Sequence, residues 1–147
     1  MQITVTDRET IERGLVIRAG TYAVISVRDP DKRRVRIPKA AGLRGKLELA
    51  FHDTEPIGGM KPPPELTLMT EDQAGQIVQF VLQHHHNVNA LLIHCEQGMS
   101  RSPAIAAAIA RTLDLDSHAF ETEYQPNQHV KALVLDAFQN EFARRNR

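Results

Sequence analysis

Residues 88–103 have the sequence VNALLIHCEQGMSRSP, and this stretch decides the fold. It opens with a continuous apolar run from Val88 to Ile93, which is typical of a buried strand. A polar loop follows, with a cysteine and an arginine separated by five residues. We interpret Ser102 as an N-cap and Pro103 as the first helical residue. The stretch therefore predicts a strand, a loop and a helix N-terminus, in that order.

The predicted loop has the residues that an anion site needs. Free amide groups and the positive end of the helix dipole face such a loop, and together with Arg101 they favour the thiolate form of Cys95. The guanidinium of Arg101 can form a bidentate pair with a tetrahedral oxyanion, and Gly98 permits tight curvature. We predict that Cys95 is a nucleophile. The alternative is an inert buried thiol, which is a common fate of cysteine.

Two further strands and a long loop are predicted upstream. Tyr22 to Val27 is a short β-branched run that stops at a turn signal, and Lys46 to Phe51 alternates polar and apolar residues. Between them, Lys32 to Arg36 predicts a charged loop. Ile57 to Met69 is rich in glycine and proline, which cannot sustain a helix or a central strand. We expect this segment to be a long loop that acts as a lid.

Helices follow the strands in alternation. Thr70 and Gln73 form a capping-box pattern, which predicts a helix from about Glu71 to His85. Further helices are predicted over the ranges Pro103 to Leu113, Ser117 to Glu123 and Gln128 to about Arg144. Because a helix separates two strands, the fold class is α/β: a single domain with a central, mostly parallel sheet flanked by helices.

The bulk composition excludes several classes of protein. The 147 residues and 41% hydrophobic content fit one domain, and 18 basic residues balance 18 acidic ones, so we expect no nucleic-acid partner and no membrane partner. No apolar run reaches the roughly 20 residues of a membrane span, and the first residues lack a signal-peptide pattern. The single cysteine fits a reducing compartment. We therefore expect a cytoplasmic protein.

Two segments of the sequence resemble a known family. His94 to Ser102 is similar to the His-Cys-x2-Gly-x-Ser-Arg-Ser signature of dual-specificity phosphatases, in the protein-tyrosine phosphatase superfamily. Tyr124 to Val130 is similar to the Pro-Asn segment that opens a late helix in that family. The resemblance covers roughly Thr21 to Phe142, whereas the residues before Thr21 match nothing in the pattern.

The resemblance implies a cysteine-dependent phosphatase domain over residues 1–147, without metal or cofactor. It implies hydrolysis of a phosphorylated protein or a small phosphomonoester through a phosphocysteine on Cys95. Ser102 would stabilise the cysteine thiolate as a leaving group, and His94 would orient the loop from behind. The implied phosphate-binding residues are Glu96, Gln97, Gly98, Met99, Ser100 and Arg101.

Such a reaction needs a carboxylic acid that protonates the leaving oxygen and then activates water. The family takes this aspartate from a loop after an earlier strand, and Asp53 occupies that kind of position. Glu55 is the main rival. Asp29 follows a different strand and is interpreted as the first residue of the turn Asp29-Pro30.

Two other functions stay open at this stage. One is a phosphate-recognition module without turnover, and the other is a rhodanese-type sulfur transferase, which also carries a cysteine in an anion-binding loop. For a phosphatase, the variable loop positions are Glu96, Gln97 and Met99. None of them has a cationic side chain that could bind additional phosphates, which disfavours polyphosphorylated substrates. We expect a shallow or moderately deep cleft that admits more than phosphotyrosine. The oligomeric state is open.

Two other features have simpler interpretations. The cluster His84 to His86 could suggest a metal site, but histidines in a last helical turn interact favourably with the helix dipole. The tail Arg144 to Arg147 is interpreted as a solvated helix end, with partner binding as the alternative.

Overall fold

The computed structural model describes residues 1–14 and 20–146. In chain order the elements are β1 (Gln2–Asp7), α1 (Arg8–Glu12), β2 (Tyr22–Arg28), β3 (Leu43–Ala50), α2 (Glu71–His84), β4 (Ala90–Cys95), α3 (Arg101–Thr112), α4 (His118–Thr122) and α5 (Gln128–Arg145). Within these residues, no helix is both long and apolar enough to cross a bilayer.

Four parallel strands form one sheet in the order β1-β4-β2-β3. The interior strands β2 and β4 are buried along almost their whole length, as expected for a parallel sheet that is covered on both faces. The chain runs from β3 through α2 to β4, which is the helical crossover that a parallel arrangement requires. The predicted α/β fold is confirmed.

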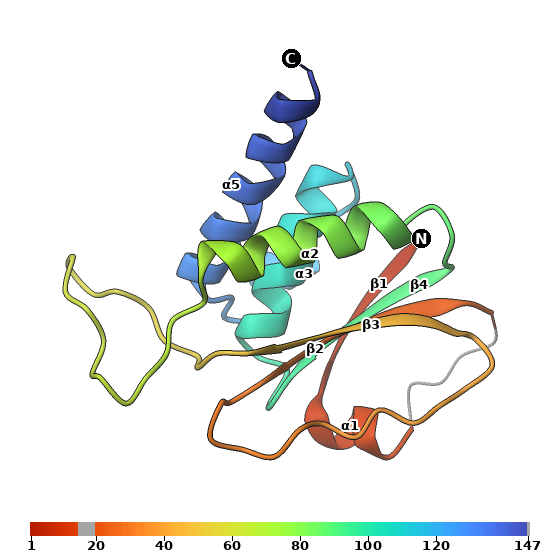
Figure 1. Cartoon of the computed structure of the whole chain (residues 1–147), viewed down its shortest axis with the longest axis horizontal. Coiled ribbons are helices and arrows are strands. Elements are labelled where there is room, and N and C mark those ends of the chain that lie inside the picture. Colours follow the sequence, from red (N-terminus) through yellow and green to blue (C-terminus); the bar gives the residue numbers. More distant parts are fainter. Residues whose placement is uncertain (15–19, 147) are drawn as a thin grey trace.

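Helices α2, α3 and α5 cover one face of the sheet (Figure 1). The main core lies there and includes Ile25, Ile77, Ile93, Ile105 and Phe138, all at most 1% exposed. Burying an aliphatic side chain of this size contributes about 1.5–3 kcal/mol. Helix α3 is rich in buried alanines, and these small side chains let it lie close to the sheet.

Helix α1 and residues 29–42 cover the opposite face, where Ile11 and Val35 pack with apolar side chains of β2 and β4 (Figure 1). The N-terminal residues, which the sequence left unassigned, thus supply both a strand and a helix. Pairing between β1 and β4 runs from Gln2↔Ala90 to Asp7↔Cys95. Since β1 is an edge strand of mostly half-buried residues, it lacks the apolar run that marks an interior strand.

Two predicted strands have shifted boundaries. β4 begins at Ala90 rather than Val88 and continues through Cys95, because β1 pairs with it as far as Cys95. β3 begins at Leu43 and ends at Ala50, one residue before the predicted end at Phe51.

The predicted helices agree with α2 to α5 within a few residues, and the capping box of Thr70 and Gln73 is present. Arg147, in the predicted tail, lies outside the described residues.

The predicted glycine- and proline-rich loop joins β3 to α2, and its one β-bridge pairs Ile57 with Met60. The base of the loop is closed by two hydrogen bonds: the His52 amide donates to the Thr67 carbonyl at 2.8 Å, and the Thr67 amide donates to His52 Nδ1 at 2.9 Å. The loop is therefore anchored at both ends, beside the carboxyl edge of the sheet.

Candidate active site

Cys95 is the last residue of β4 and only 2% exposed. Its Sγ lies 3.2 Å from Ser102 Oγ and accepts a hydrogen bond from the Gly98 amide at 3.2 Å. Both contacts suit a sulfur that carries negative charge. The thiol therefore borders the main apolar core and has two polar contacts on the side of the loop.

Gly98 makes the loop conformation possible. Its φ is +72°, and a Cβ at this position would lie 2.8 Å from the Thr6 carbonyl oxygen of β1. Any side chain here would combine left-handed backbone strain with a clash against backbone. The close approach of β1 thus fixes the curvature of the loop, as the sequence predicts for this glycine.

The prediction that Ser102 caps the helix and that Pro103 is its first residue is wrong. Helix α3 begins at Arg101, with Ser100 as the N-cap, so Ser102 and Pro103 lie inside the first turn. Proline is tolerated there because the first-turn amides have no partner within the helix. The shift turns the fully buried Ser102 hydroxyl toward Cys95, where the resemblance expects it.

Arg101 is almost fully buried beside the cysteine. Its Nη1 donates to Asp29 Oδ1 and to the Phe51 carbonyl, both at 2.7 Å. Its Nε is buried and has no partner among the described residues. Buried donors are nearly always paired, so this N–H is suited to an acceptor that enters the pocket.

Asp53 lies at the mouth of the same pocket and is exposed. Its Oδ1 accepts two hydrogen bonds, from Ser100 Oγ at 2.8 Å and from Asn127 Nδ2 at 2.9 Å. Both neutral donors use Oδ1, so neither of these two hydrogen bonds occupies Oδ2.

The two rival carboxylates have other environments. Glu55 accepts a hydrogen bond from the Gln128 amide at the start of α5, and it is absent from the lining of the pocket that contains Cys95. Asp29 closes the predicted turn by accepting from the Lys32 amide, but its side chain also binds Arg101. The predicted turn at Asp29 is confirmed, and the contact of its side chain with Arg101 is an addition that the sequence did not indicate.

His94 supports the loop from within the sheet and is fully buried. Its Nδ1 faces the Cys95 carbonyl at 3.2 Å, so Nδ1 carries the proton, and Nε2 accepts from Ser26 Oγ at 2.6 Å. Burial lowers the pKa of His94, which keeps the ring neutral.

A cavity of about 280 Å³ brings these groups together. Its lining includes Cys95, the loop residues Glu96, Gln97, Met99, Ser100 and Arg101, and the side chains Asp29, Lys32 and Asp53. The predicted residues Cys95, Arg101 and Asp53 thus share one pocket. Gly98 belongs to the loop but is not part of the pocket lining, and the buried side chains of Ser102 and His94 also lie outside that lining.

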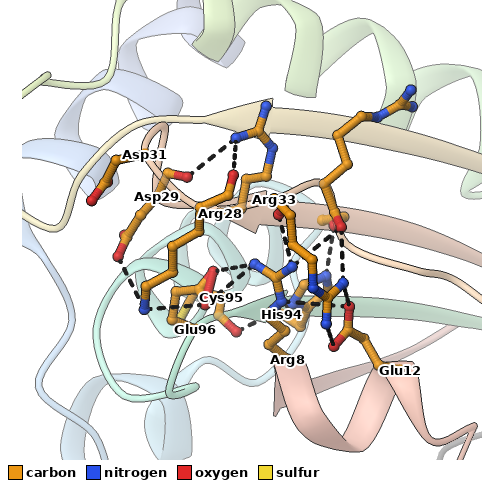
Figure 2. A network of polar contacts seen from close by, with 12 residues as sticks. Arg8, Glu12, Arg28, Asp29, Asp31, Arg33, His94, Cys95 and Glu96 are labelled. Carbon is orange, nitrogen blue, oxygen red and sulfur yellow. Dashed lines mark hydrogen bonds and ion pairs between the residues drawn. The ribbon is translucent and has the colours of Figure 1, made fainter.

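A network of charges supports the loop from the side of α1 (Figure 2). Arg8 is 9% exposed, and its Nη1 donates to Glu96 at 3.0 Å, while its Nη2 donates to the Arg33 carbonyl at 2.7 Å. Hydrogen bonds from Arg33 lower the pKa of Glu12 to about 2, so this neighbour of Arg8 stays ionised. The side chain of Glu96 is therefore held by Arg8.

Sequence reasoning missed four residues that contact the site: Arg8, Asp29, Lys32 and Asn127. For Asn127 the sequence offered an indication, because it lies in the Pro-Asn segment that resembles the family. Arg8 had none, because the 88 residues that separate it from Glu96 give no local pattern. Lys32 Nζ lies 3.5 Å from Oδ2 of its sequence neighbour Asp29 and 3.6 Å from Oε1 of Glu96, and only folding brings Glu96 close to it.

The histidine cluster contributes to packing. The ring of His84 stacks on Phe80 with centroids 4.5 Å apart, and burial lowers the pKa of His85. Across residues 1–14 and 20–146, no group of three or more His, Cys, Asp or Glu side chains could hold a metal ion.

Comparison with known proteins gives matches at the level of structure. No family model and no curated protein matches the sequence. Human DUSP28 matches with a TM-score of 0.62 and 18% identity, over 97% of this chain and 94% of that one. A mouse putative dual specificity phosphatase, complexed with zinc tungstate, matches with a TM-score of 0.60 and 19% identity, over 94% of this chain and 82% of that one.

PTPMT1 in complex with PI(5)P matches with a TM-score of 0.58 and 15% identity, over 97% of this chain and 94% of that chain. At such identities the similarity concerns the fold. The chain has the fold of the dual-specificity phosphatases in the protein-tyrosine phosphatase superfamily.

Proposed function

We propose that the chain is a phosphatase that hydrolyses phosphomonoesters through a phosphocysteine on Cys95. One observation carries the proposal: the buried Nε–H of Arg101 has no partner among the described residues, and Arg101 lines the same pocket as Cys95. Both hydrogen bonds of this guanidinium use Nη1, so Nε and Nη2 are left for two phosphoryl oxygens.

In the first step the thiolate of Cys95 attacks phosphorus, so that an S–P bond forms and the ester P–O bond breaks. Asp53 Oδ2 gives its proton to the leaving oxygen. Arg101 and the amides of the loop Glu96 to Arg101 stabilise the charge on the equatorial oxygens.

In the second step water attacks the phosphocysteine, Asp53 accepts the proton from that water, and phosphate leaves as the S–P bond breaks. The Ser102 hydroxyl lies 3.2 Å from Sγ and can donate to the departing thiolate. Each turnover regenerates the thiolate and the protonated aspartate.

A phosphorylated protein side chain is the substrate class that the pocket favours. Asp29, Asp53 and Glu96 line it against Lys32 and Arg101, so bound phosphate finds few other cations nearby. This balance disfavours substrates with several phosphates. Whether the enzyme prefers phosphotyrosine or acts on phosphoserine and phosphothreonine as well is set by the cleft depth, and we propose dual specificity.

The test is turnover of p-nitrophenyl phosphate by the wild-type chain and by Cys95→Ser, with Leu115→Ser as a surface control. We expect activity in the wild type and the control and none in Cys95→Ser. Turnover of thiosulfate and cyanide without phosphatase activity would indicate the sulfur transferase instead. Phosphopeptide binding without any turnover would indicate a recognition module.

A further inference from the structure

The phosphate pocket continues into a second hollow. This hollow has a volume of about 560 Å³ and shares Asp53 and Ser100 with the phosphate pocket. Its other walls come from the loop after β3 and from the segment before α5, including Ile57, Gln125 and Gln128. A ligand held by Cys95 and Arg101 therefore has room to extend past Asp53.

The hollow is not built for a second anion. Among the described residues that line it, none is lysine or arginine, whereas Asp53 and Glu55 are acidic. The Gln128 amide already donates to the carboxylate of Glu55. The lining therefore offers no cationic side chain that could offset the charge of another phosphate. An acidic neighbour of the phosphorylated group would be repelled here.

Exposed apolar side chains gather around the two adjoining pockets. Six large apolar side chains are exposed among the described residues, and four of them belong to the loop after β3 or to the lining of the phosphate pocket. Ile57 is 80% exposed and Met60 73% exposed, at the tip of the loop after β3, while Leu66 and Met99 line the phosphate pocket. Scattered exposed apolar residues need no explanation, but a group beside a polar pocket marks a binding site.

The remaining walls suit a peptide chain. Gln125 and Gln128 bring side-chain amides, and Ser100 brings a hydroxyl, which are groups that hydrogen-bond a peptide backbone. A lipid phosphate at an anionic membrane surface would meet the acidic side chains Asp53 and Glu55 at this end of the cleft. The occupant that fits both the apolar tip and the amides is an extended peptide.

We propose that the hollow, with the tip residues Ile57 and Met60, binds an apolar side chain that neighbours the phosphorylated residue of a peptide substrate. The inference rests on the proposed function only in placing the phosphate against Arg101. The two pockets share Asp53 and Ser100, so the apolar side chain belongs to a residue close in sequence to the phosphorylated one, in a chain that advances about 3.3 Å per residue when extended.

The test measures binding to the Cys95→Ser chain, which holds substrate without turnover. Phosphotyrosyl peptides carry Leu, Ser or Glu at each of the three positions on either side of the phosphotyrosine. We expect Leu to lower Kd about tenfold relative to Ser at one or two adjacent positions, and Glu to raise it there. Adding Ile57→Ser and Met60→Ser should remove the preference for Leu, while adding Leu115→Ser, an exposed leucine elsewhere, should keep it.

Equal binding of all the peptides would overturn the inference, and so would a Leu preference that survives both tip substitutions. Vesicles of phosphatidylcholine with a phosphatidylinositol monophosphate give a second arm: if the tip substitutions weaken only vesicle binding, the occupant is a lipid. Turnover of p-nitrophenyl phosphate by the wild type reports separately on the proposed function. Loss of that turnover with the Leu preference intact refutes the phosphatase and leaves the hollow as a peptide site.

Discussion

Strands β2 and β3 each end near an aspartate of the phosphate pocket, and the two aspartates are held by different kinds of partner. Asp29, after β2, binds the guanidinium of Arg101 at 2.7 Å and lies 3.5 Å from Lys32 Nζ. Asp53, after β3, is held at one oxygen by the neutral groups of Ser100 and Asn127.

The difference teaches that the partners of a carboxylate, rather than its place after a strand, indicate its role. A carboxylate between two cations serves as a fixed anion, and Asp29 therefore orients Arg101. A carboxylate with one oxygen occupied by neutral donors keeps the other free for a substrate, and this is the reason why we propose Asp53 as the acid. Substitutions at Asp53, Asp29 and Asn127 test this comparison, and one at Arg8 tests a more distant contact.

Asp53→Ala should give the largest effect on a phosphotyrosyl peptide, a loss of about 10²–10⁴-fold in kcat, because the leaving oxygen then departs without a proton. An ester with a much more acidic leaving group needs little protonation and should lose far less. Steady-state kinetics on both substrates measure the ratio. Glu55→Ala is the matched control, and a leaving-group effect in that variant instead would assign the acid to Glu55.

Asp29→Ala should lower kcat/KM about 10- to 100-fold, because the guanidinium of Arg101 loses its carboxylate partner and its orientation. The loss should be similar for both leaving groups, unlike that of Asp53→Ala. Asp29→Asn keeps an acceptor oxygen for Nη1 and should recover part of the activity. A loss that depends on the leaving group would make Asp29 a proton donor and reverse the comparison.

Asn127→Ser should lower kcat about fivefold on a phosphotyrosyl peptide, because Asp53 loses one of two donors that orient it. Serine can still cap α5, where the Asn127 side chain accepts from the Val130 amide, so the thermal midpoint should change little. If the loss of kcat is equal for substrates with poor and with good leaving groups, Asn127 acts through the fold alone and not through Asp53.

Much of this site could be predicted from sequence because its central features are local. A strand, a loop and a helix start follow one another within residues 88–103, and Cys95, Gly98 and Arg101 are fixed by that order. The helix start was misplaced by two residues because Ser-Pro is also the pattern of a first turn. Arg8 and Asp29 could not be assigned, since their partners Glu96 and Arg101 lie 88 and 72 residues away.

Arg8→Gln tests one of these distant contacts and should have the smallest effect on activity, about twofold. The ion pair with Glu96 is largely buried, with both side chains 11% exposed, so its loss should cost about 1–3 kcal/mol of folding free energy. Denaturant unfolding measures the change. The double variant Arg8→Gln with Glu96→Gln also removes the carboxylate that has lost its Arg8 partner and should recover part of the stability; no recovery would mean that the pair is not coupled.

The most direct test of the central claim is capture of the phosphorylated enzyme. The Asp53→Ala chain, whose second step lacks its base, is mixed with an aryl phosphate, quenched with denaturant at alkaline pH within the first turnover, where a phosphocysteine is stable, and digested for mass spectrometry. The account predicts one phosphoryl group on the peptide that contains Cys95, and none in Cys95→Ser. A phosphoryl group on any other residue, or turnover that persists in Cys95→Ser, would contradict it.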